Sequence, residues 1–437
     1  MTKQKTKNSF LTTNHSILSK NLTFAQNKNK AENLIALPNI ATSKIAIKLK
    51  PATETLVKKG HPWVFENSII KQNKEGKSGD LAVIFDSRKN KFLACGFYDP
   101  NSPIRIKILH TNSPVTINSE WFAKKVKEAY QKRIPLLQTD TNSYRLIYGE
   151  NDSLPSLVAD VYDNVLVVKL YASFWFYHLK DILPELIKVS KATTTVLRLS
   201  RNVQKEKNQF NFTDGQILDG ELKNEVIVFK EHGVNFSANV IHGHKTGYFL
   251  DHRANRKKVG ELAKGKTVLD VFSYAGGFSI HALVGGAKAV TSLDISAPAL
   301  EIAKSNAKLN KFKGTHHTIT GDAFDELAKL AIAKKKFDIV VIDPPSFAKS
   351  ATEVDKALAS YKKLTHLGLK LVQKKGILVL ASCSSRVTSE MFFDLVEETL
   401  QKYNANYTIT ETTQHDIDHP IGFKEGAYLK CVYVRIH

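Results

Sequence analysis

The stretch VLDVFSYAGGFSIHA, residues 268–282, decides how the second half of this 437-residue chain folds. Its first residues are mostly apolar and typical of a buried strand that ends near Asp270. Gly276 and Gly277 then allow a close backbone turn before a helical pattern begins. A strand, a turn and a helix form the first half of a βαβ unit. Because ligands bind beyond the carboxyl ends of parallel strands, we expect Asp270, Phe272 and Gly276 to line a ligand site.

The alternation of strand and helix patterns continues to the end of the chain. Strands are expected at AVTSLDIS, FDIVVID and GILVLASCS, with helical patterns between them. The last two β runs, YTITETTQ and YLKCVYVRI, are separated by a polar loop and predict an antiparallel hairpin. The predicted fold class is therefore α/β, with a Rossmann-like, mostly parallel sheet and an antiparallel hairpin at its edge.

Three segments precede this α/β domain, which we expect over residues 226–437. Residues 1–43 are rich in Lys, Asn, Thr and Ser, carry Glu32 as their only acid, and predict a disordered basic tail. Residues 44–115 contain short β runs punctuated by Gly, Pro, Asn and Asp, which predict a small β domain. Residues 116–225 mix strand and helix patterns and predict a central α+β domain.

The composition indicates a soluble protein with a polyanionic partner. The net charge is +21 and the pI is about 9.6, which favours nucleic acid, although a lysine-rich proteome would also produce this balance. No apolar run approaches the roughly 18–20 residues of a membrane span, so we expect no membrane partner. Cys95, Cys383 and Cys431 are too few and too scattered for a disulfide framework or a zinc site. This usage suits a reducing cytoplasm and leaves any of the three free to act as a thiol.

Acidic residues follow four successive strands of the α/β domain: Asp270, Asp294, Asp322 and Asp343. Each alone would be a turn or cap residue, but together they favour a cofactor site. Asp294 falls 24 residues after Asp270, where an acid can accept both ribose hydroxyl groups, and Asp322 is placed to hold an adenine amino group. The chain lacks the G-x-G-x-x-G fingerprint and the P-loop, which disfavours a dehydrogenase or a nucleotide triphosphate site. S-adenosylmethionine, with its sulfonium, ammonium and ribose groups, fits better.

The motifs VLDVFSYAGGFSIHA, DPPSFAKS and SCSS resemble those of class I S-adenosylmethionine-dependent methyltransferases that act on large-subunit ribosomal RNA. Upstream, HGHKTGYFLDHR (residues 242–253) resembles a signature of one family among them, which makes 5-methylcytosine in 23S rRNA. The resemblance implies a class I methyltransferase fold, S-adenosylmethionine as cofactor and 23S rRNA as partner.

The resemblance extends over nearly the whole chain except its N-terminal tail, which we do not expect in the family. KGHPWVFENSI is similar to part of the family's PUA-type RNA-binding domain, which implies that residues 44–115 form a PUA-like domain. YRLIYGENDSLPSLVADVYDN is similar to the start of the family's central domain.

The resemblance also implies cofactor-binding residues in the 242–253 signature. Lys245, Thr246, Gly247 and Tyr248 are implied to line the methionine end of the cofactor. Asp251 and Arg253 are expected to hold this segment, and for Arg253 a purely structural role is equally open. His242 and His244 have a spacing that a metal could use, but no third ligand is evident and the chemistry needs no metal, so we expect none.

Methylation of pyrimidine carbon 5 places its own demand on the sequence. Carbon 5 is a weak nucleophile, and a thiolate that adds to carbon 6 makes it enamine-like, so a cysteine is needed beside the methyl donor. Cys383 ends a strand that should lie next to the one ending at Asp343, and we expect it to be this nucleophile, with core packing as the alternative. Arg386 is a candidate for stabilising the thiolate. Cys95 and Cys431 are expected to pack in cores.

Asp343 and Pro344 are expected in the site as well. We expect Asp343 both to contact the cofactor and to hydrogen-bond nitrogen 3 of the base, although it could merely shape the site. Pro344, which ends the strand, is expected beside the cofactor. The sequence does not identify the base that removes the carbon-5 proton.

Two other functions stay open at this stage. One is a guanine-nitrogen methyltransferase of rRNA, because nitrogen methyltransferases also use acid-Pro-Pro turns; this acceptor would need no thiol. The other is a non-catalytic RNA-binding assembly factor that has kept the fold. A homodimer also stays open.

Overall fold

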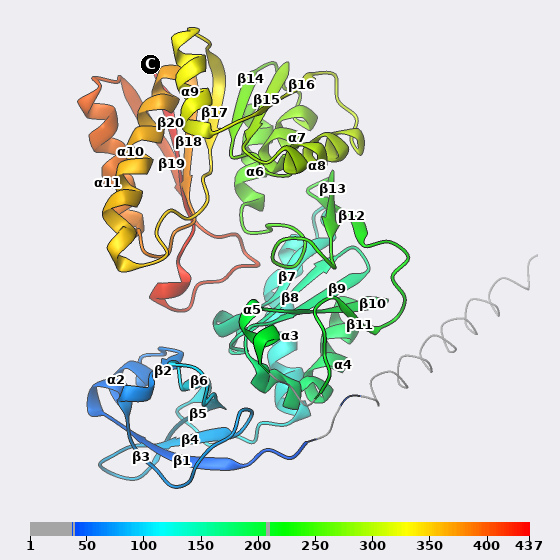
Figure 1. The fold of residues 1–437 in the computed structure, drawn as a ribbon, viewed down its shortest axis with the longest axis vertical. Coiled ribbons are helices and arrows are strands. Elements are labelled where there is room, and N and C mark those ends of the chain that lie inside the picture. Colours follow the sequence, from blue (N-terminus) through cyan, green and yellow to red (C-terminus); the bar gives the residue numbers. More distant parts are fainter. Residues whose placement is uncertain (1–36, 38–39, 207–209) are drawn as a thin grey trace, which may run out of the picture.

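The computed structural model describes residue 37, residues 40–206 and residues 210–437. The chain forms three lobes in sequence order along the long axis of the molecule, a β lobe, a central lobe and an α/β lobe (Figure 1). Most of the predicted basic tail, residues 1–36 and 38–39, lies outside the described residues.

The β lobe is built on one six-stranded sheet with the order β2-β6-β5-β4-β1-β3. Alternating residues of its strands, such as Ile45, Ile47 and Ile84, form a buried core. Its elements are β1 (Lys44–Leu49), α2 (Pro51–Lys58), β2 (Trp63–Val64), β3 (Ile69–Gln72), β4 (Leu81–Phe85), β5 (Phe92–Tyr98) and β6 (Ile106–Thr111).

The central lobe combines a five-stranded sheet, of order β11-β10-β9-β8-β7, with two packed helices. Its core is rich in aromatic residues, among them Phe122, Phe174 and Trp175. Its elements are α3 (Ser119–Leu137), β7 (Ser143–Tyr148), β8 (Leu157–Tyr162), β9 (Val165–Leu170), α4 (Leu179–Ser190), β10 (Thr194–Leu199), α5 (Arg201–Lys205) and β11 (Gln216–Asp219). A separate hairpin of β12 (Val226–Glu231) and β13 (Val234–Asn239) follows.

The α/β lobe contains a seven-stranded sheet of order β16-β15-β14-β17-β18-β20-β19. Strands β14 to β18 pair in parallel, and β20 pairs antiparallel with both β18 and β19. This arrangement confirms the predicted fold class, including the antiparallel hairpin at the edge. The strands are β14 (Thr267–Val271), β15 (Ala289–Asp294), β16 (Thr315–Thr320), β17 (Phe337–Ile342), β18 (Val372–Ser382), β19 (Tyr407–Thr413) and β20 (Lys430–Ile436).

Helices cover both faces of this sheet, as a crossover topology requires. Phe278 and Ile280 of α7 pack on one face, and Leu327 of α9 and Phe392 of α11 pack on the other. The helices are α6 (Arg253–Leu262), α7 (Gly277–Val284), α8 (Ala297–Lys308), α9 (Ala323–Ile332), α10 (Val354–Leu371) and α11 (Ser389–Lys402). In the described part of the chain, none of these or the other helices has the length and apolarity to cross a membrane.

The loop between β19 and β20, residues 414–429, reaches from the α/β lobe to both other lobes. In the β lobe, the Trp63 ring lies 5.1 Å from that of Phe423. In the central lobe, the backbone nitrogen of Arg145 donates to Asp418 Oδ2 at 2.9 Å. We call this segment the crossing loop, because it ties the three lobes together beside the carboxyl edge of the seven-stranded sheet.

Candidate active site

The turn between β14 and α7 buries Asp270 completely. Its Oδ2 accepts hydrogen bonds from the Ser279 backbone nitrogen at 2.9 Å and from Ser279 Oγ at 2.6 Å. Burial raises the pKa of Asp270 to about 7, because the charged form loses solvation. Gly276 has φ +79°, and a Cβ there would lie 2.9 Å from Ala303 Cβ, so this turn requires glycine. The carboxyl group therefore sits beneath a tight turn that can approach a ligand closely.

Asp294 ends β15 and links two loops at the sheet edge. Its Oδ2 accepts from the Tyr274 backbone nitrogen at 2.8 Å, and its Oδ1 accepts from that of Ser296 at 2.9 Å. Phe272 and Tyr274 both have positive φ, +63° and +47°, which is uncommon for aromatic residues. The bond from Tyr274 to Asp294 helps to hold this strained turn, so Asp294 fixes the turn in addition to facing the edge where a ribose would lie.

Asp322 caps the N-terminus of α9. Its Oδ1 accepts from the backbone nitrogens of Phe324 at 2.9 Å and Asp325 at 3.2 Å. This is the ordinary role of an Asp at this position. This cap is compatible with a contact between Asp322 Oδ2 and the adenine of the cofactor. That contact stays a prediction.

The 242–253 signature is hydrogen-bonded to the central lobe, a contact that the sequence did not predict. Thr246 is buried, and its Oγ1 donates to Asp160 Oδ2 at 2.5 Å. The Tyr162 hydroxyl accepts from the Tyr248 backbone nitrogen at 3.1 Å and lies 2.9 Å from Thr246 Oγ1. Thr246 therefore directs its hydroxyl to the central lobe, and we expect it to position the segment.

The other three residues predicted to line the cofactor differ in exposure. The side chain of Lys245 is exposed, and its carbonyl accepts from Lys169 Nζ at 2.6 Å. Gly247 is buried with φ +139°, where a Cβ would lie 3.0 Å from that of Ala238. Tyr248 is buried, and its hydroxyl would lie 3.0 Å from a Cβ on Gly277. Tyr248 therefore reaches the β14–α7 turn, which brings the signature and the first motif together.

Cys383 and the Asp343-Pro344 turn meet at the ends of neighbouring parallel strands. Cys383 follows β18, and its Sγ lies 3.6 Å from the carbonyl oxygen of Pro344, to which the thiol donates. Asp343 follows β17, and its Oδ1 lies 3.3 Å from His252 Nε2. Burial, followed by the negative charges of Asp343 and Asp251, raises the pKa of Cys383 to about 12. The site thus favours the protonated thiol.

The positive charge that favours the Cys383 thiolate comes from Lys430, and the prediction for Arg386 is wrong. Arg386 is exposed, whereas Lys430 is fully buried and lies opposite Ser382 in the β18–β20 register. The charge of Lys430 lowers the pKa of Cys383 and so partly offsets the effects that raise it. The prediction failed because Arg386 is close to Cys383 in sequence, but its side chain points into solvent. A lysine inside the apolar strand YLKCVYVRI was the sequence signal for Lys430.

Lys430 also organises the loop after Cys383. Its Nζ donates to the carbonyl oxygens of Ser384 at 2.5 Å, Tyr428 at 3.1 Å, and Val387. Three carbonyl oxygens match the three donors of an ammonium group. Burial lowers the pKa of Lys430 to about 8.

The serines around Cys383 are structural. Ser382 Oγ donates to the Tyr361 hydroxyl at 2.9 Å, and Ser384 Oγ donates to the Ala348 carbonyl oxygen at 3.3 Å. These bonds tie the Cys383 loop to α10 and to the segment after the two prolines.

A group of half-buried polar residues that sequence reasoning did not assign lies beside the thiol. The Tyr428 hydroxyl donates to Asp251 Oδ2 at 2.7 Å, and the Tyr428 ring lies 4.6 Å from that of His415. Burial raises the pKa of Asp251, but the charges of His252 and His419 and the bond from Tyr428 lower it below its ordinary value overall. Tyr428 and His415 belong to the crossing loop, so only the tertiary structure brings them here.

Arg253 has the structural role that the sequence left open. It is fully buried, with Nη1 3.0 Å from Asp416 Oδ2 and Nη2 2.9 Å from Asp418 Oδ2. Its Nη2 also donates to the Ser143 carbonyl oxygen at 3.2 Å. Arg253 therefore joins α6, the crossing loop and the central lobe.

The other two cysteines lie within packed strands, as predicted. Cys431 is fully buried in β20 and Cys95 is almost fully buried in β5, and both are free thiols. Of the described residues, no group of three or more His, Cys, Asp or Glu is arranged to hold a metal ion.

The residues present fit S-adenosylmethionine. Buried polar atoms without a hydrogen-bond partner among the described residues include Asp270 Oδ1, Ser273 Oγ and the Tyr248 hydroxyl. All three lie at the carboxyl edge of the sheet around β14. Buried polar groups are nearly always satisfied in folded proteins, so such a group of atoms indicates a polar ligand. An ammonium group and ribose hydroxyls can supply the missing donors and acceptors.

Comparisons with known proteins agree with this site. A family model described as S-adenosylmethionine-dependent methyltransferase matches residues 145–420, and a PUA-like domain model matches residues 47–111. The chain is 40% identical over 408 residues to a ribosomal RNA large subunit methyltransferase of Deinococcus radiodurans, covering 92% of this chain and 100% of that protein. It is 35% identical over 380 residues to the ribosomal RNA large subunit methyltransferase I of Tolumonas auensis, covering 86% and 95%.

Solved structures share the fold. A protein from Streptococcus mutans matches with a TM-score of 0.75 at 22% identity, covering 89% of this chain and 99% of that one. A second structure, of a protein complexed with SAH, matches with a TM-score of 0.74 at 22% identity, covering 90% and 100%. The motif order, the polar site at the sheet edge and the length of the matches lead to one conclusion: this chain belongs to the family of S-adenosylmethionine-dependent methyltransferases and carries a PUA-like domain in its N-terminal part.

Proposed function

We propose that the protein transfers a methyl group from S-adenosylmethionine to carbon 5 of a cytosine in large-subunit ribosomal RNA. The observation that carries the proposal is the position of Cys383, whose Sγ lies 3.6 Å from the Pro344 carbonyl oxygen at the strand end beside Asp343. A nitrogen acceptor would need no thiol there. The relatives named as large-subunit rRNA methyltransferases support the RNA substrate, and so does the net charge of +21.

The cofactor-binding residues are proposed from their places around the sheet edge. When bound, S-adenosylmethionine supplies an electrophilic methyl group. Asp270 would accept from its ammonium group, Asp294 from the ribose hydroxyls and Asp322 from the adenine amino group. The full proposed set is Lys245, Thr246, Gly247, Tyr248, Asp270, Phe272, Gly276, Asp294, Asp322, Asp343 and Pro344.

The thiol and Asp343 would act together on the base. The proton of the Cys383 thiol passes by way of Asp343 to nitrogen 3 of the cytosine, and Sγ forms a bond to carbon 6. The electron pair of the carbon 5–carbon 6 double bond would move to carbon 5, which would then take the methyl group as its bond to the sulfonium sulfur breaks and leaves a thioether. Removal of the carbon-5 proton restores the double bond as the bond from Sγ to carbon 6 breaks and the proton on nitrogen 3 is released.

This proton path has a physical reason in the site. The negative charge of Asp343 is, after burial, the largest cause that raises the pKa of Cys383. When Asp343 holds a proton in a hydrogen bond to the base, that charge is neutralised and the thiolate becomes more favourable. The nucleophile would therefore form when a base is bound, which limits side reactions of the free thiol.

The test is incubation of the purified protein with labelled S-adenosylmethionine and unmodified ribosomal RNA, followed by nucleoside analysis. We expect label in 5-methylcytosine, its loss in Cys383→Ala, and its retention in the control Cys431→Ala, whose thiol lies in a packed strand. S-adenosylmethionine binding should survive in Cys383→Ala. Label in a guanosine would overturn the acceptor and the role of Cys383. Absence of label with intact RNA binding would favour a non-catalytic assembly factor.

The division of the chain and its location are proposed on the same basis. We propose a PUA-like domain over residues 44–115, a central domain over 116–225 and the methyltransferase domain over 226–437. We also propose a cytoplasmic location, which three free cysteines and an rRNA substrate support.

A further inference from the structure

A continuous chain of hydrogen bonds joins Asp270 to the outer edge of the seven-stranded sheet. Asp270 Oδ2 lies 2.6 Å from Ser279 Oγ, which lies 2.6 Å from Ser292 Oγ. Ser292 Oγ in turn lies 2.7 Å from His316 Nε2. We infer that this chain is a proton relay, through which His316 receives the proton that Asp270 gives up when the ammonium group of S-adenosylmethionine binds. The inference rests on the proposed function, in which Asp270 binds that group, and it makes His316 a positioning residue that acts through Asp270.

The strand register puts the members of the relay on one face of the sheet. Asp270 of β14 and Ser292 of β15 are cross-strand partners. Ser292 is also paired with Thr318 of β16, two residues beyond His316, so His316 shares the face of Ser292. Ser279 comes from α7, which packs on this face, and its hydroxyl bridges Asp270 and Ser292. Because β16 is the edge strand, the relay runs from the cofactor site to the rim of the sheet.

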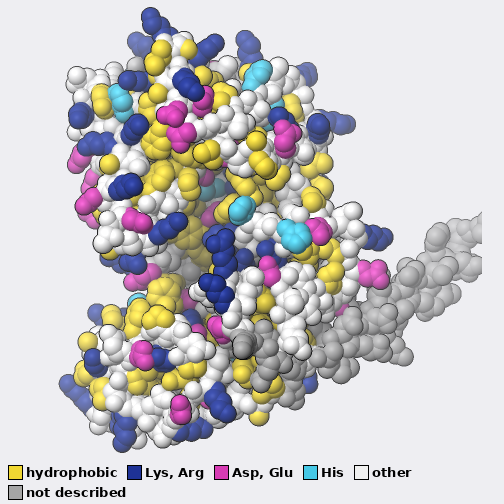
Figure 2. All heavy atoms as spheres, in the orientation of Figure 1, with side chains coloured by type: hydrophobic (Ala, Val, Ile, Leu, Met, Phe, Trp, Pro, Cys, Tyr) yellow, Lys and Arg dark blue, Asp and Glu magenta, His cyan; other side chains and the backbone are white. Residues whose placement is uncertain are grey.

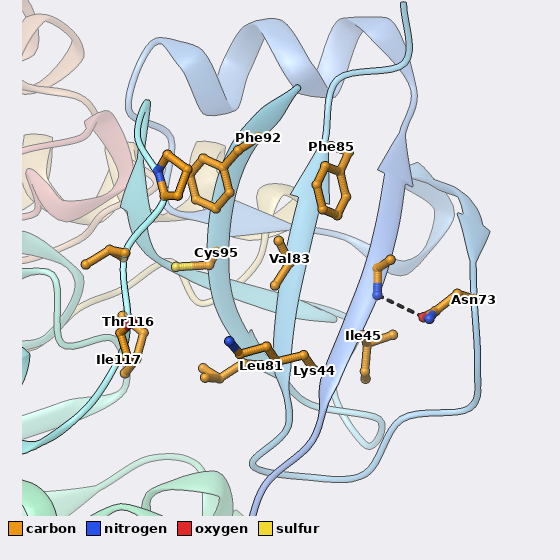
Figure 3. A pocket seen from close by; sticks show the side chains of 13 residues that line it. Lys44, Ile45, Asn73, Leu81, Val83, Phe85, Phe92, Cys95, Thr116 and Ile117 are labelled. Atoms are coloured by element: carbon orange, nitrogen blue, oxygen red, sulfur yellow. Dashed lines mark hydrogen bonds between the residues drawn. The ribbon is translucent and has the colours of Figure 1, made fainter. Parts of the chain in front are cut away.

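The two ends of the relay differ in their access to solvent. Asp270, Ser279 and Ser292 are completely buried, whereas His316 is half-buried. Asp270 Oδ1 has no hydrogen-bond partner among the described residues and is left for a ligand, while Oδ2 belongs to the relay. The groove of about 500 Å³ on one face of the β lobe, by contrast, is lined mostly by apolar side chains such as Val83 and offers a proton no such path (Figure 3).

The hydroxyl groups allow the hydrogen bonds to run in either direction, because each can donate one and accept others. With Asp270 protonated, Oδ2–H donates to Ser279, Ser279 donates to Ser292, and Ser292 donates to the unprotonated Nε2 of His316. When an ammonium group binds at Oδ1, the Oδ2–H bond breaks and each proton moves one place along the chain. Nε2 gains a proton, Nδ1 releases one to water, and every hydrogen bond then points toward the carboxylate. One proton leaves the protein for each cofactor bound.

The charges around Asp270 favour its protonated form in the free protein. Burial raises the pKa of Asp270 to about 7, with smaller contributions from the negative charges of Asp343 and Asp294. Tyr248, which also faces Asp270, stays neutral because burial raises the pKa of its hydroxyl far above the ordinary value. An added cation therefore changes the balance at Asp270 and displaces the proton.

The surroundings of His316 favour passage of the proton rather than its retention. Burial, followed by the positive charges of His317 on the same strand and Lys304 on α8, lowers the pKa of His316 below its ordinary value. Lys304 is itself paired with Glu301 at 2.7 Å, which reduces its effect. A neutral imidazole accepts a proton at one nitrogen and releases another from its second nitrogen, which suits the end of a relay.

The experiment follows the ring nitrogens of His316 by NMR in the full-length protein labelled with ¹⁵N-histidine, with the signals assigned by their loss in His316→Gln. At pH 6.5 Asp270 is mostly protonated in the free protein. We expect Nε2 of His316 to change from unprotonated to protonated when S-adenosylmethionine is added to saturation. His317, which lies on the opposite face of the strand, should keep its protonation state. A merely structural role of His316 would produce no such change.

A second variant interrupts the relay without touching either end. Ser292→Ala removes the hydroxyl that joins Ser279 to His316, so the change at His316 should disappear although S-adenosylmethionine still binds. Ser305→Ala is the matched control, because the Ser305 hydroxyl bonds only locally, to the Glu301 carbonyl oxygen at 2.9 Å. In this control the change at His316 should remain.

The rate of proton release gives a measurement that does not depend on Ser292→Ala folding. S-adenosylmethionine is mixed with the protein in a weak buffer that contains a pH indicator, in a stopped-flow instrument. His316→Gln should slow proton release roughly ten-fold or more, because an amide hydrogen-bonds but does not pass a proton on. His317→Gln, at the exposed neighbour, should release the proton as fast as the wild type.

The outcomes separate the relay from the proposed function. If S-adenosylmethionine binds and 5-methylcytosine is formed while the ring nitrogens of His316 do not change, the relay is overturned and the proposed function stands. A change at His316 that persists in Ser292→Ala, or proton release equally fast in His316→Gln, also overturns the relay. If calorimetry shows that the wild type does not bind S-adenosylmethionine, the proposed function fails and the relay fails with it.

Discussion

At Cys383, the local charges oppose the ionised state that the proposed reaction needs. Asp343 and Asp251 act against the thiolate, and Lys430 acts for it. These opposed charges together favour the neutral thiol, and on the proposed mechanism a loss of charge at Asp343 would favour the thiolate. The same design fits a cysteine that must react with a bound base and avoid other electrophiles.

We expect Lys430→Met to slow alkylation of Cys383 by iodoacetamide roughly ten-fold at pH 6.5–7.5, where Lys430, whose pKa is about 8, is mostly charged, because loss of that positive charge raises the pKa of the thiol further. Lys430→Arg keeps the charge and should restore most of the rate. Mass spectrometry of the peptide that contains Cys383, over a pH series, gives the measurement. A profile that Lys430→Met leaves unchanged, alongside a lowered Tm, would reduce Lys430 to a structural residue of the loop.

Asp270 should make cofactor binding depend on pH. Its pKa is raised from 3.8 to about 7 in the free protein, so it is mostly protonated below pH 7. Binding of an ammonium group favours the carboxylate, so affinity for S-adenosylmethionine should rise up to about ten-fold per pH unit as pH increases from 5.5 to 7. Calorimetry at pH 6 in buffers of different ionisation enthalpy should show release of a proton.

The control for this effect is Asp270→Asn, which should bind weakly at every pH and release no proton at this site. Folding stability should change with pH in the opposite direction to cofactor binding. Because the folded-state pKa lies above the ordinary value, ionisation of Asp270 costs the ligand-free protein stability as pH rises from about 4 to about 7. Cofactor affinity that does not change between pH 5.5 and 7 would contradict the assignment.

At the scale of single elements, the β14–α7 turn depends on both conformation and space. Gly276 and Gly265 both have positive φ, +79° and +71°. A Cβ at Gly276 would meet Ala303 of α8, whereas a Cβ at Gly265 would have no heavy atom within 4 Å. The two glycines therefore separate the cost of backbone strain from the cost of packing.

We expect Gly265→Ala to lower the free energy of unfolding by about 1 kcal/mol, the cost of a left-handed conformation for alanine. Gly276→Ala should cost about 2–4 kcal/mol, since overpacking is added to that strain. It should also weaken S-adenosylmethionine binding, because the turn must move. Denaturant unfolding and calorimetry provide the two measurements. Equal stability loss in both variants, with unchanged cofactor affinity in Gly276→Ala, would show that the turn tolerates a shift of α8.

At the scale of the whole molecule, the crossing loop couples the three lobes to the catalytic edge. It contacts Trp63 of the β lobe, is bound by Arg253 of α6, and supplies Tyr428 to Asp251 beside the thiol. Figure 2 shows exposed Lys and Arg side chains beside the hollow between the lobes. RNA held across the lobes would therefore lie against the loop that helps to build the site.

We expect Arg253→Met to lower the free energy of unfolding by about 3–5 kcal/mol, because the fully buried Asp418 would lose its arginine partner and Asp416 would lose its ion pair. Arg435→Met, at a half-buried arginine of the same lobe whose Nη1 makes a solvent-exposed hydrogen bond to the Lys375 carbonyl oxygen, is the control and should change stability by less than about 1 kcal/mol. Unfolding should be measured at pH 7 with denaturant, and limited proteolysis should show faster cleavage within residues 414–429. A stability change as small as that of Arg435→Met would refute the structural role.

The pH dependence of this ion pair has a defined direction. Burial raises the pKa of Asp418, but Arg253 and His419 hold it well below the ordinary value overall. The pair therefore stabilises the fold above pH of about 4 and loses that contribution as pH falls further. In Arg253→Met, the protein should lose less stability between pH 5 and pH 3 than the wild type does.

The sequence by itself determined the α/β fold and its edge hairpin, because hydrophobic periodicity and glycine turns are local properties that each strand and helix carries. It also located the acids at or just beyond the carboxyl ends of β14, β15, β16 and β17 and the motif cysteine Cys383, since parallel strands bring their carboxyl ends to one edge.

Only the tertiary structure decided the partners of these residues. Lys430, rather than Arg386, is the cation beside the thiol because β20 inserts antiparallel next to β18. Thr246 faces Asp160 of the central lobe, and Tyr428 reaches Asp251 through a loop that starts 14 residues earlier in the chain. Such contacts join residues far apart in sequence, and their electrostatic effect depends on burial and distance, which no local pattern encodes.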